Sequence, residues 1–371
     1  MKSNSKYFVN NYRYKKITVK VGSNVLTKSD GTLNDENMAH LVDQIARLHK
    51  AGVEVVLVSS GAVAAGRSLI EPHKKLDTVS SRQLWSAVGQ VKLINHYAGY
   101  FQKYTITCAQ VLTTKENFSS RVHYLNMKNC ISTLNENGVI PIVNENDTIS
   151  VTELMFTDND ELSGLIASLV NSEALIILSN IDGIYNGSPD LPESKVIAEI
   201  PVGTRLESSI ISTQKSNFGR GGMMTKYNIA SKVAKEGITV HIANGMKKNV
   251  LLDLMDTSKT VVNTRFVPKS KKASDVKKWI AYSESFAKGE VKINEGATKA
   301  LLSDKATSLL LIGVVEITGS FKKGDIVRIK NENNELIGIG KSQYSSEKAT
   351  KVLGSKNQQA LVHYDYLYLI D

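Results

Sequence analysis

The chain has 371 residues, 42% of them hydrophobic and 22% charged, and its formal net charge is +10. This length predicts two domains, and the composition is typical of a soluble globular protein. No apolar run is long enough to span a bilayer and the first residues lack the apolar stretch of a signal peptide, so we expect a cytoplasmic protein. The two cysteines, Cys108 and Cys130, stand outside any CxxC or Cys/His pattern, which argues against a zinc site or a disulfide framework.

Residues 1–15 are polar and basic, and we expect them to form a flexible leader with no fold of its own. Beyond this leader, β-branched apolar runs alternate with helix-like segments. Buried strands are expected at residues 17–21, 53–58, 139–143, 174–178 and 239–242, and helices at 35–50, 84–102 and 227–236, the first of them capped by Asn34. This alternation predicts an α/β fold with a mostly parallel sheet sandwiched by helices.

Polar motifs follow four of the expected strands. They are Gly22-Ser23, Ser59-Ser60-Gly61, Asn144 to Asp147 and Ser179-Asn180. In parallel sheets of this kind, ligands bind at the carboxyl ends of the strands. One such motif would be an ordinary turn, but four at equivalent positions predict a binding site.

The pattern of expected secondary structure changes after about residue 264. Short alternating strands with glycine turns are typical of a small β-rich domain, and we expect them at 309–317, 326–330 and 336–339. We place the boundary near residues 258–276, with a first domain at 16–263 and a linker and second domain at 264–371. Positive charge is denser in this second part. A basic surface attracts anions, including nucleotides and RNA, although ordinary lysine-rich solubility is the favoured explanation of the charge alone.

Lys20 interrupts the first buried run and stands beside Gly22 and Ser23. A lysine inside an apolar strand is costly unless its ammonium group reaches a ligand or the strand end. Gly22 lets a backbone approach a phosphate closely, and Ser23 can donate a hydrogen bond to it. Taken alone, a lysine that extends to solvent from the strand end is the simpler interpretation.

A glycine-rich segment at 218–226 precedes the helix expected at 227–236. Its free N–H groups and the helix N-terminus would hold a polyphosphate. No glycine directly precedes Lys226, so this is not a Walker A loop, and glycine richness alone would also suit a flexible linker. The closing pair Thr225-Lys226 favours phosphate binding.

Carboxylate and amide side chains gather in two segments, Asn144 to Asp147 and Asp158 to Asp160. Carboxylates packed together repel one another, so they need cations: a substrate ammonium group, Mg²⁺ or the two lysines. An exposed acidic loop is the alternative on composition alone.

Taken in order, these motifs resemble the amino acid kinase family, in its glutamate-phosphorylating branch. The resemblance runs from about residue 16 to 350, and its C-terminal part looks like a PUA domain, a small β-fold. The motifs that carry it are Lys20 to Ser23, Val58 to Gly66, Ala87 to Gln90, Pro141 to Asp147, Asp158 to Asp160 and Gly221 to Lys226. In the C-terminal part they are Trp279-Ile280, Gly296-Ala297, Ser308 to Leu310, Gly313-Val314, Gly319 to Asp325 and Tyr344 to Ser346.

The resemblance implies a kinase that uses ATP and Mg²⁺ to phosphorylate the γ-carboxylate of L-glutamate, the first step of proline biosynthesis. Lys20 and Lys226 would flank the transferred phosphoryl group, and Asp160 would orient them. The residues implied in holding glutamate are Ser60, Asp147, Asn159 and Asn144. Those implied in contacting ATP are Lys20, Gly22, Ser23, Ser179, Asn180, Arg220, Gly221, Gly222, Met223, Met224, Thr225 and Lys226. No residue is assigned as a metal ligand.

The resemblance also implies a homo-oligomer and feedback inhibition by L-proline. Two alternatives stay open. One is another member of the family that acts on a different carboxylate; the PUA-like part and the Asn144 to Asp147 motif argue against it. The other is an RNA-binding protein with an inactive kinase domain, which the basic C-terminal part permits and the presence of both lysines and Asp160 opposes.

Overall fold

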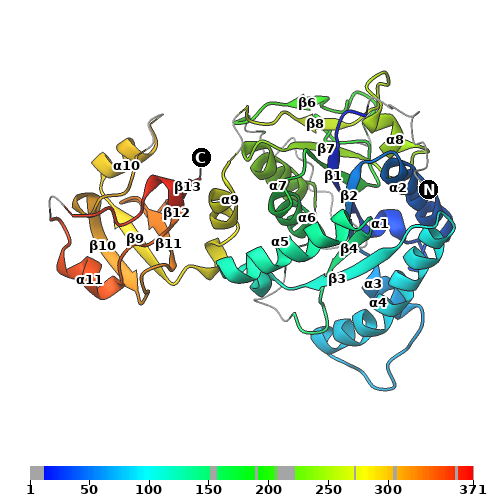
Figure 1. Ribbon diagram of the computed structural model, residues 1–371, viewed down its shortest axis with the longest axis horizontal. Helices are drawn as coiled ribbons and strands as arrows, with labels where there is room; N and C mark the ends of the chain where they lie inside the picture. Colours follow the sequence, from blue (N-terminus) through cyan, green and yellow to red (C-terminus); the bar gives the residue numbers. More distant parts are fainter. Residues whose placement is uncertain are drawn as a thin grey trace, which may run out of the picture. The chain divides into compact units, whose positions relative to one another are not determined.

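The computed structural model describes residues 12–150, 156, 158–188, 191–204, 206, 222–270, 273–303, 307–355 and 358–370. The chain divides into two compact units, one comprising Met1–Asn117 and Leu125–Lys272, the other Phe118–Tyr124 and Ala273–Asp371. The first unit contains a large sheet with helices and the second a small sheet (Figure 1). The predicted α/β class with a β-rich C-terminal part is therefore confirmed.

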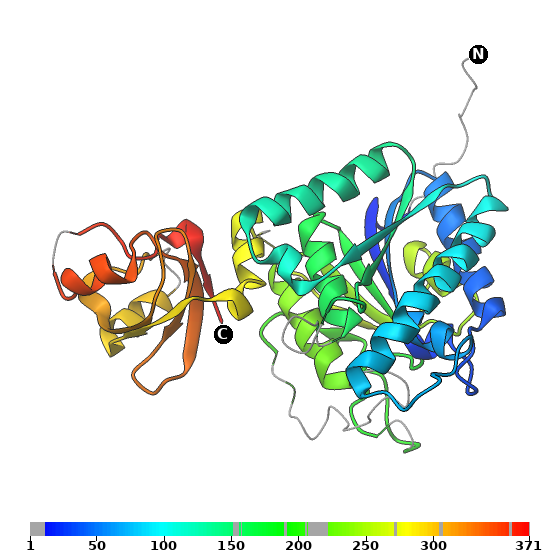
Figure 2. The ribbon, with the colours of Figure 1, turned by 90° about the horizontal axis from the view of Figure 1, so that it is seen from below.

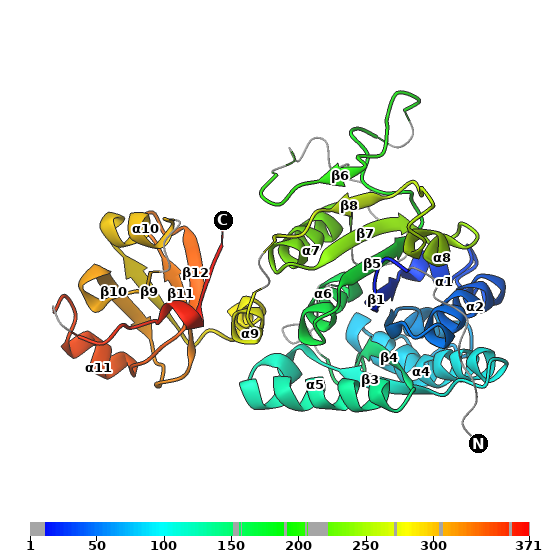
Figure 3. The ribbon, with the colours of Figure 1, turned by 45° about the horizontal axis from the view of Figure 1, so that its top comes forward.

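An eight-stranded sheet forms the centre of the first unit in the described residues, in the order β3-β4-β2-β1-β5-β7-β8-β6. Its neighbouring strands are parallel except for β7 and β8, so the sheet is mostly parallel, as predicted. Figure 3 shows the succession from β1 through β5 and β7 to β8. The strands are β1 (Lys16–Val21), β2 (Glu54–Ser59), β3 (Cys108–Thr113), β4 (Ile140–Glu145), β5 (Ala174–Ser179), β6 (Glu199–Ile200), β7 (Thr239–Asn244) and β8 (Thr264–Phe266).

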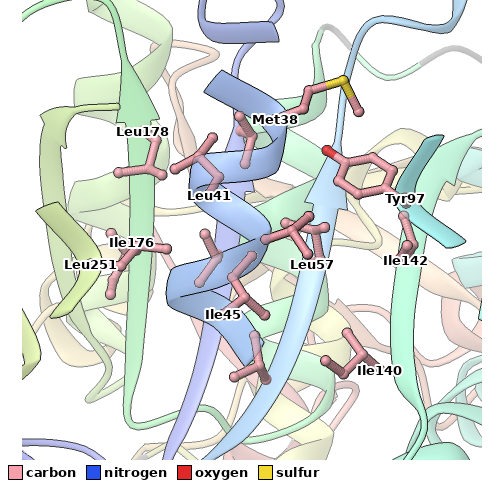
Figure 4. Packing of buried hydrophobic residues seen from close by; sticks show 14 of the residues in the cluster. Met38, Leu41, Ile45, Leu57, Tyr97, Ile140, Ile142, Ile176, Leu178 and Leu251 are labelled. Atoms are coloured by element: carbon pink, nitrogen blue, oxygen red, sulfur yellow. The ribbon is translucent and has the colours of Figure 1, made fainter. Parts of the chain in front are cut away.

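Helices cover this sheet because both of its faces are apolar. Side chains alternate along β5, so Ala174, Ile176 and Leu178 join one hydrophobic cluster while Leu175 and Ile177 join another. The first cluster draws on α1, α2, α3, α4 and α8, and Figure 4 shows α2 packed there; the second draws on α6 and α7. The helices are α1 (Ser23–Leu26), α2 (Asp35–Lys50), α3 (Ala62–Arg67), α4 (Thr78–Gln102), α5 (Arg121–Glu136), α6 (Asn159–Leu169), α7 (Met223–Lys235) and α8 (Val250–Met255), with a 3-10 turn η1 at Lys115–Phe118.

Helix α4 begins six residues before the position expected from its apolar pattern. The Asp77 side chain accepts hydrogen bonds from the amides of Val79 and Ser80, at 2.8 and 2.9 Å, and so caps a first turn that is polar. The cap of α2 by Asn34 is confirmed, since its side chain accepts a bond from the Asn37 amide at 3.1 Å.

Glycines set the path from β2 into α3 and the packing of α3 on α4. Gly61, the N-cap of α3, has φ +100°, a backbone conformation that glycine adopts without strain. Where the two helices cross, a Cβ on Gly66 would lie 1.8 Å from the Trp85 carbonyl oxygen, and one on Gly89 would lie 1.8 Å from that of Ala62. The helix backbones are therefore in direct contact, with no room for a side chain between them.

The second unit contains a five-stranded sheet in its described residues, ordered β10-β9-β11-β12-β13 and drawn yellow to red in Figure 2. The segment Phe118–Tyr124 belongs to this unit, and the Phe118 carbonyl accepts a hydrogen bond from the Trp279 indole at 3.2 Å. The elements are α9 (Asp275–Ala281), η3 (Glu284–Phe286), β9 (Gly289–Ile293), α10 (Glu295–Leu301), η4 (Leu311–Gly313), β10 (Val314–Gly319), β11 (Ile326–Lys330), β12 (Leu336–Lys341), α11 (Ser346–Lys351), η5 (Tyr364–Tyr366) and β13 (Leu367–Leu369).

The described end of the expected leader is joined to the fold. Residues 1–11 lie outside the described residues, but the Arg13 amide donates to a carbonyl of α8 at 2.8 Å. The Tyr14 hydroxyl lies 2.9 Å from Nε2 of the buried His241. The expectation of a leader without a fold therefore does not hold for residues 12–15.

The sheet also extends beyond Asn263, the predicted end of the first domain. Strand β8 starts at Thr264 and pairs with both β7 and β6. The Thr264 hydroxyl accepts a hydrogen bond from the Ile184 amide at 2.7 Å, and Phe266 is 1% exposed in the hydrophobic cluster under α7.

Two truncated chains test this boundary. A chain that ends at Asn263 should be less stable than one that ends at Lys272 by at least about 3 kcal/mol, because it loses a buried phenylalanine together with β8. Both chains lack most of the second unit, so they differ only in this edge of the sheet. Chemical denaturation followed by circular dichroism measures the difference, and equal midpoints would contradict it.

Candidate active site

The polar strand ends that the sequence marks meet in one cavity of the first unit. Strands β4, β2, β1 and β5 are parallel neighbours, so their carboxyl ends lie along one edge of the sheet. A cavity of about 670 Å³ opens there. The predicted site residues that line it are Lys20, Gly22, Ser23, Ser60, Asn144, Asp147, Asn159, Asp160, Ser179, Asn180 and Lys226.

Six predicted nucleotide contacts are not among these lining residues. Arg220 and Gly221 lie outside the described residues. Gly222 is the N-cap of α7, and Met223, Met224 and Thr225 form its first turn without lining the cavity. Among residues 222–226, which the structure describes, Lys226 is the one that lines the cavity.

Asp160 joins two lysines that come from distant parts of the chain. Nζ of Lys20, on β1, lies 2.6 Å from Asp160 Oδ1, and Nζ of Lys226, on α7, lies 2.9 Å from Oδ2. All three residues are buried, and Asp160 is 1% exposed. One carboxylate thus holds two ammonium groups side by side against the cavity.

The three charges of this ion triad (Lys20, Asp160 and Lys226) stabilise one another. Removing one partner of a buried ion pair typically costs about 3–5 kcal/mol, because the other charge is left uncompensated. Burial by itself would raise the pKa of Asp160, but the two ammonium groups outweigh it and hold this pKa at about 2. Asp160 is therefore ionised at neutral pH.

Asp158 both starts α6 and faces the cavity. Its Oδ1 accepts hydrogen bonds from the amides of Asp160 and Glu161, at 2.8 and 3.0 Å, which fixes the helix start that presents Asp160. Its Oδ2 is buried and has no hydrogen-bond partner among the described residues. Burial, and then the charge of Asp160, raise the pKa of Asp158 to about 6. This buried oxygen therefore lacks a compensating partner, which a cation beside it would supply.

Three of the residues expected to hold the substrate form one amide cluster: Ser60, Asn144 and Asn159. The side-chain nitrogen Nδ2 of Asn159 donates to Ser60 Oγ and to Asn144 Oδ1, both at 3.0 Å, and to the Ser59 carbonyl at 2.9 Å. Asn144 Oδ1 also accepts a bond from the Glu145 amide at 2.9 Å. The ends of β2 and β4 and the start of α6 are therefore tied together.

Arg82 is a cavity residue that the sequence reasoning missed. It lies on α4, 65 residues from Asp147, and its Nε donates to Asp147 Oδ1 at 2.7 Å. Its Nη2 also contacts Asp147 and lies 3.4 Å from Glu145 Oε2. No spacing or motif links α4 to the end of β4, so a single sequence carries no signal for this contact.

Two buried carboxylates share the guanidinium of Arg82. Burial, and then the charge of Asp147, raise the pKa of Glu145 to about 7. Burial also raises the pKa of Asp147, although Arg82 opposes the change. Because one positive group serves two carboxyl groups, this end of the cavity favours the entry of a further positive charge.

Strand ends β1 and β5 lie in close contact beside Lys20. The Gly22 amide donates to the Leu178 carbonyl at 3.1 Å, and a Cβ on Gly22 would lie 3.2 Å from that oxygen and 3.5 Å from Lys20 Nζ. Ser179 Oγ reaches Asn180 Oδ1 at 3.4 Å on the same edge. The predicted nucleotide residues of both strands are thus assembled next to the ion triad.

A family model described as the amino acid kinase family matches residues 15–244. The chain belongs to the amino acid kinase family. A second model, for the PUA domain, matches residues 289–363. Both parts of the predicted resemblance are confirmed, and the matched kinase region contains the whole lining of the cavity.

Curated relatives extend the similarity over nearly the full chain. A glutamate 5-kinase from Bacteroides thetaiotaomicron is 60% identical over 356 residues, which cover 96% of this chain and 99% of the relative. A glutamate 5-kinase from Chlorobaculum tepidum is 48% identical, with 96% and 98% covered. One from Dehalococcoides mccartyi is 37% identical, with 93% of each covered. The predicted enzyme class, a kinase, is confirmed.

Proposed function

We propose that this chain transfers the γ-phosphoryl group of ATP to the γ-carboxylate of L-glutamate, giving L-glutamyl 5-phosphate, the first step of proline biosynthesis. The observation that carries the proposal is the ion triad, with two buried ammonium groups held at one place beside an amide cluster. The names of full-length relatives at up to 60% identity support glutamate as the acceptor.

The acceptor needs no general base. A glutamate side chain has a pKa of roughly 4.3, so at neutral pH it is already an anionic nucleophile. The barrier lies in bringing this anion to a charged phosphate and in stabilising an in-line, largely dissociative transition state. Positioning and positive charge therefore carry the catalysis.

Lys20 and Lys226 supply that positive charge. Asp160 fixes both ammonium groups before any substrate enters, so little reorganisation is needed when charge develops on the transferred group. Asp160 itself stays ionised because the lysines lower its pKa. We infer that it orients the lysines and takes no proton during the reaction.

Asp158 fits the Mg²⁺ ion that accompanies ATP. Mg²⁺ in kinases is usually held by one or two carboxylates together with substrate phosphates. Within the described residues there is no group of three or more His, Cys, Asp or Glu that could hold a metal by itself. The unpartnered Oδ2 of Asp158 suits an ion that arrives with the nucleotide, and such an ion would neutralise phosphate charge.

The amide cluster connects the two charged parts of the cavity. Asn159 directly precedes Asp160 of the ion triad, and Asn144 directly precedes Glu145, which faces Arg82. We infer that the cluster holds the γ-carboxylate of glutamate near the lysines. The α-ammonium group then reaches Asp147, with which it forms a charge-assisted hydrogen bond.

ATP turnover by the purified chain, with and without L-glutamate, tests the proposed function directly. We expect turnover to require glutamate and to be lower with aspartate, acetylglutamate or carbamate. A different preferred acceptor would identify another activity within the family, and turnover indifferent to all four would refute the assignment.

The two lysines of the ion triad should be essential. Lys20→Ala or Lys226→Ala should lower kcat by about 10²-fold or more, because each change removes charge that stabilises the transition state. Lys259→Ala is the matched control, since Lys259 pairs with Asp253 at the surface. A triad variant that keeps a near-normal kcat in steady-state assays would show that its lysine is structural.

A change at Asp147 should affect the binding of the amino acid but not the binding of the nucleotide. Asp147→Asn should raise the KM for glutamate about tenfold to hundredfold, since losing a charged hydrogen bond costs about 1.5–3 kcal/mol. The KM for ATP should hardly change, because ATP carries no ammonium group. Varying each substrate in turn measures both constants, and equal shifts in the two would argue against this role.

We also propose that L-proline inhibits by competing at or near the glutamate site, since it carries an α-ammonium and an α-carboxylate group as glutamate does. Asp147 and the segment 148–157 are its expected locus, although residues 151–155 and 157 lie outside the described residues. Glutamate saturation curves at several proline concentrations should show a rising apparent KM. Curves that superimpose up to millimolar proline would exclude this inhibition.

We further propose a homo-oligomer located in the cytoplasm. No described helix has the length and apolar character that crossing a membrane requires. Light scattering of the purified chain tests the assembly, and a monomeric mass would contradict it.

We do not propose RNA binding, because no described feature of the second unit points to RNA beyond its match to the PUA domain.

A further inference from the structure

Arg82 occupies the place where the proposed substrate has to bring its own positive charge. Its Nε and Nη2 both contact Asp147, and Nη2 also reaches Glu145. The carboxylates are 8% and 4% exposed and the Arg82 side chain 21%, so the arginine is the accessible member of the group. Its third nitrogen, Nη1, has no hydrogen-bond or ion-pair partner in the described part of the chain.

An α-amino acid that binds here carries two opposite charges on one carbon. If its ammonium group pairs with Asp147, its α-carboxylate, which is bonded to the same carbon, must lie close to that pair and beside the Arg82 guanidinium. Arginine presents five N–H donors in a planar fork that matches a carboxylate, so one Arg82 side chain can face both a protein carboxylate and a substrate carboxylate. The order of charges then alternates: Asp147, ammonium, α-carboxylate, Arg82.

We propose that Arg82 binds the α-carboxylate of the amino acid substrate and so determines specificity for α-amino acids. In this structure it neutralises Asp147 and Glu145, whose charge a substrate ammonium group would otherwise balance. This proposal rests on the proposed function, because it concerns how the acceptor of that reaction is recognised.

The contact is not needed to hold α4 in place. The Gln83 side chain donates to the Thr148 carbonyl at 2.8 Å, which ties α4 to the segment after β4 independently of Arg82. The Asp77 cap fixes the start of the helix, and the glycine crossing fixes its contact with α3. Loss of the Arg82 guanidinium should therefore change binding in the cavity more than it changes the fold.

Two simple analogues of glutamate distinguish the contribution of the α-carboxylate from that of the ammonium group. 4-Aminobutyrate keeps the ammonium group and the reacting carboxylate but lacks the α-carboxylate, and glutarate lacks the ammonium group instead. If Arg82 binds the α-carboxylate, Arg82→Gln should lower the affinity for glutamate and glutarate but not for 4-aminobutyrate. A purely structural ion pair would affect all three ligands alike.

The experiment uses the full chain and compares wild type, Arg82→Gln, Arg82→Lys and the control Arg47→Gln, whose arginine pairs with Asp43 on the exposed side of α2. We expect Arg82→Gln to raise the KM for glutamate and the inhibition constant of glutarate about tenfold to hundredfold, the range for a lost charged hydrogen bond. The inhibition constant of 4-aminobutyrate should stay within about threefold of wild type or fall. Arg82→Lys should be intermediate, because lysine keeps the charge without the fork.

Equal losses for all three ligands, or no loss for any, would overturn the role of Arg82 while leaving the proposed function intact. A wild-type chain that does not phosphorylate glutamate would overturn both. Thermal unfolding of each variant accompanies the kinetics. If Arg82→Gln is unfolded, Arg82→Lys decides: a loss for glutamate without one for 4-aminobutyrate supports the role, and equal losses refute it.

Discussion

Two ammonium groups cannot remain together in a buried cavity unless a carboxylate lies between them, and this constraint organises the first unit. Lys20 arrives on β1 and Lys226 on α7, and Asp160 meets both from the first turn of α6. The start of α6 must therefore stand at the ends of the central strands. Asp158, as its cap, sets where the helix begins and keeps one buried carboxylate oxygen without a hydrogen-bond partner among the described residues. The same short segment thus caps α6 and places Asp160 between the two lysines.

The cavity has opposite charge arrangements at its two ends. In the ion triad two cations share one anion, whereas Asp147 and Glu145 share the single cation Arg82. The amide cluster between them is neutral. A substrate with a carboxylate at one end and an ammonium group at the other is oriented by this polarity alone, before any close contact forms. In the proposed function, this polarity directs the reacting carboxylate toward the lysines.

Sequence reasoning predicted those features that local physics determines. Buried β-branched runs predicted the strands at the centre of the sheet, and Asn34 predicted the start of α2. It did not identify β8, which has three residues and no pattern of its own, or the true start of α4, whose first turn is polar. Lys20 could be identified because a lysine inside a buried strand is costly without a partner. Asp160 was marked by the cluster of carboxylate and amide side chains, and its role by the family resemblance.

The partners that were missed come from elsewhere in the chain. Arg82 sits on a surface-like stretch of α4, and only the folded chain brings it to Asp147. Glu145 belongs to a motif that the sequence marked, but its role depends on burial and on Arg82, which no spacing encodes. Charge pairs between distant elements are therefore the part of such a site that a single sequence conceals.

The backbone contact of α3 and α4 at Gly66 and Gly89 limits how the cavity could be redesigned for other acceptors of the proposed reaction. Because the helix backbones touch at Gly66 and Gly89, neither helix can move closer and no side chain can wedge between them. Space for a bulkier amino acid must come instead from side chains that line the cavity, such as Leu76, in the segment between the two helices, and Trp85, on α4. A mutant library aimed at new acceptors should diversify those two positions and keep both glycines fixed.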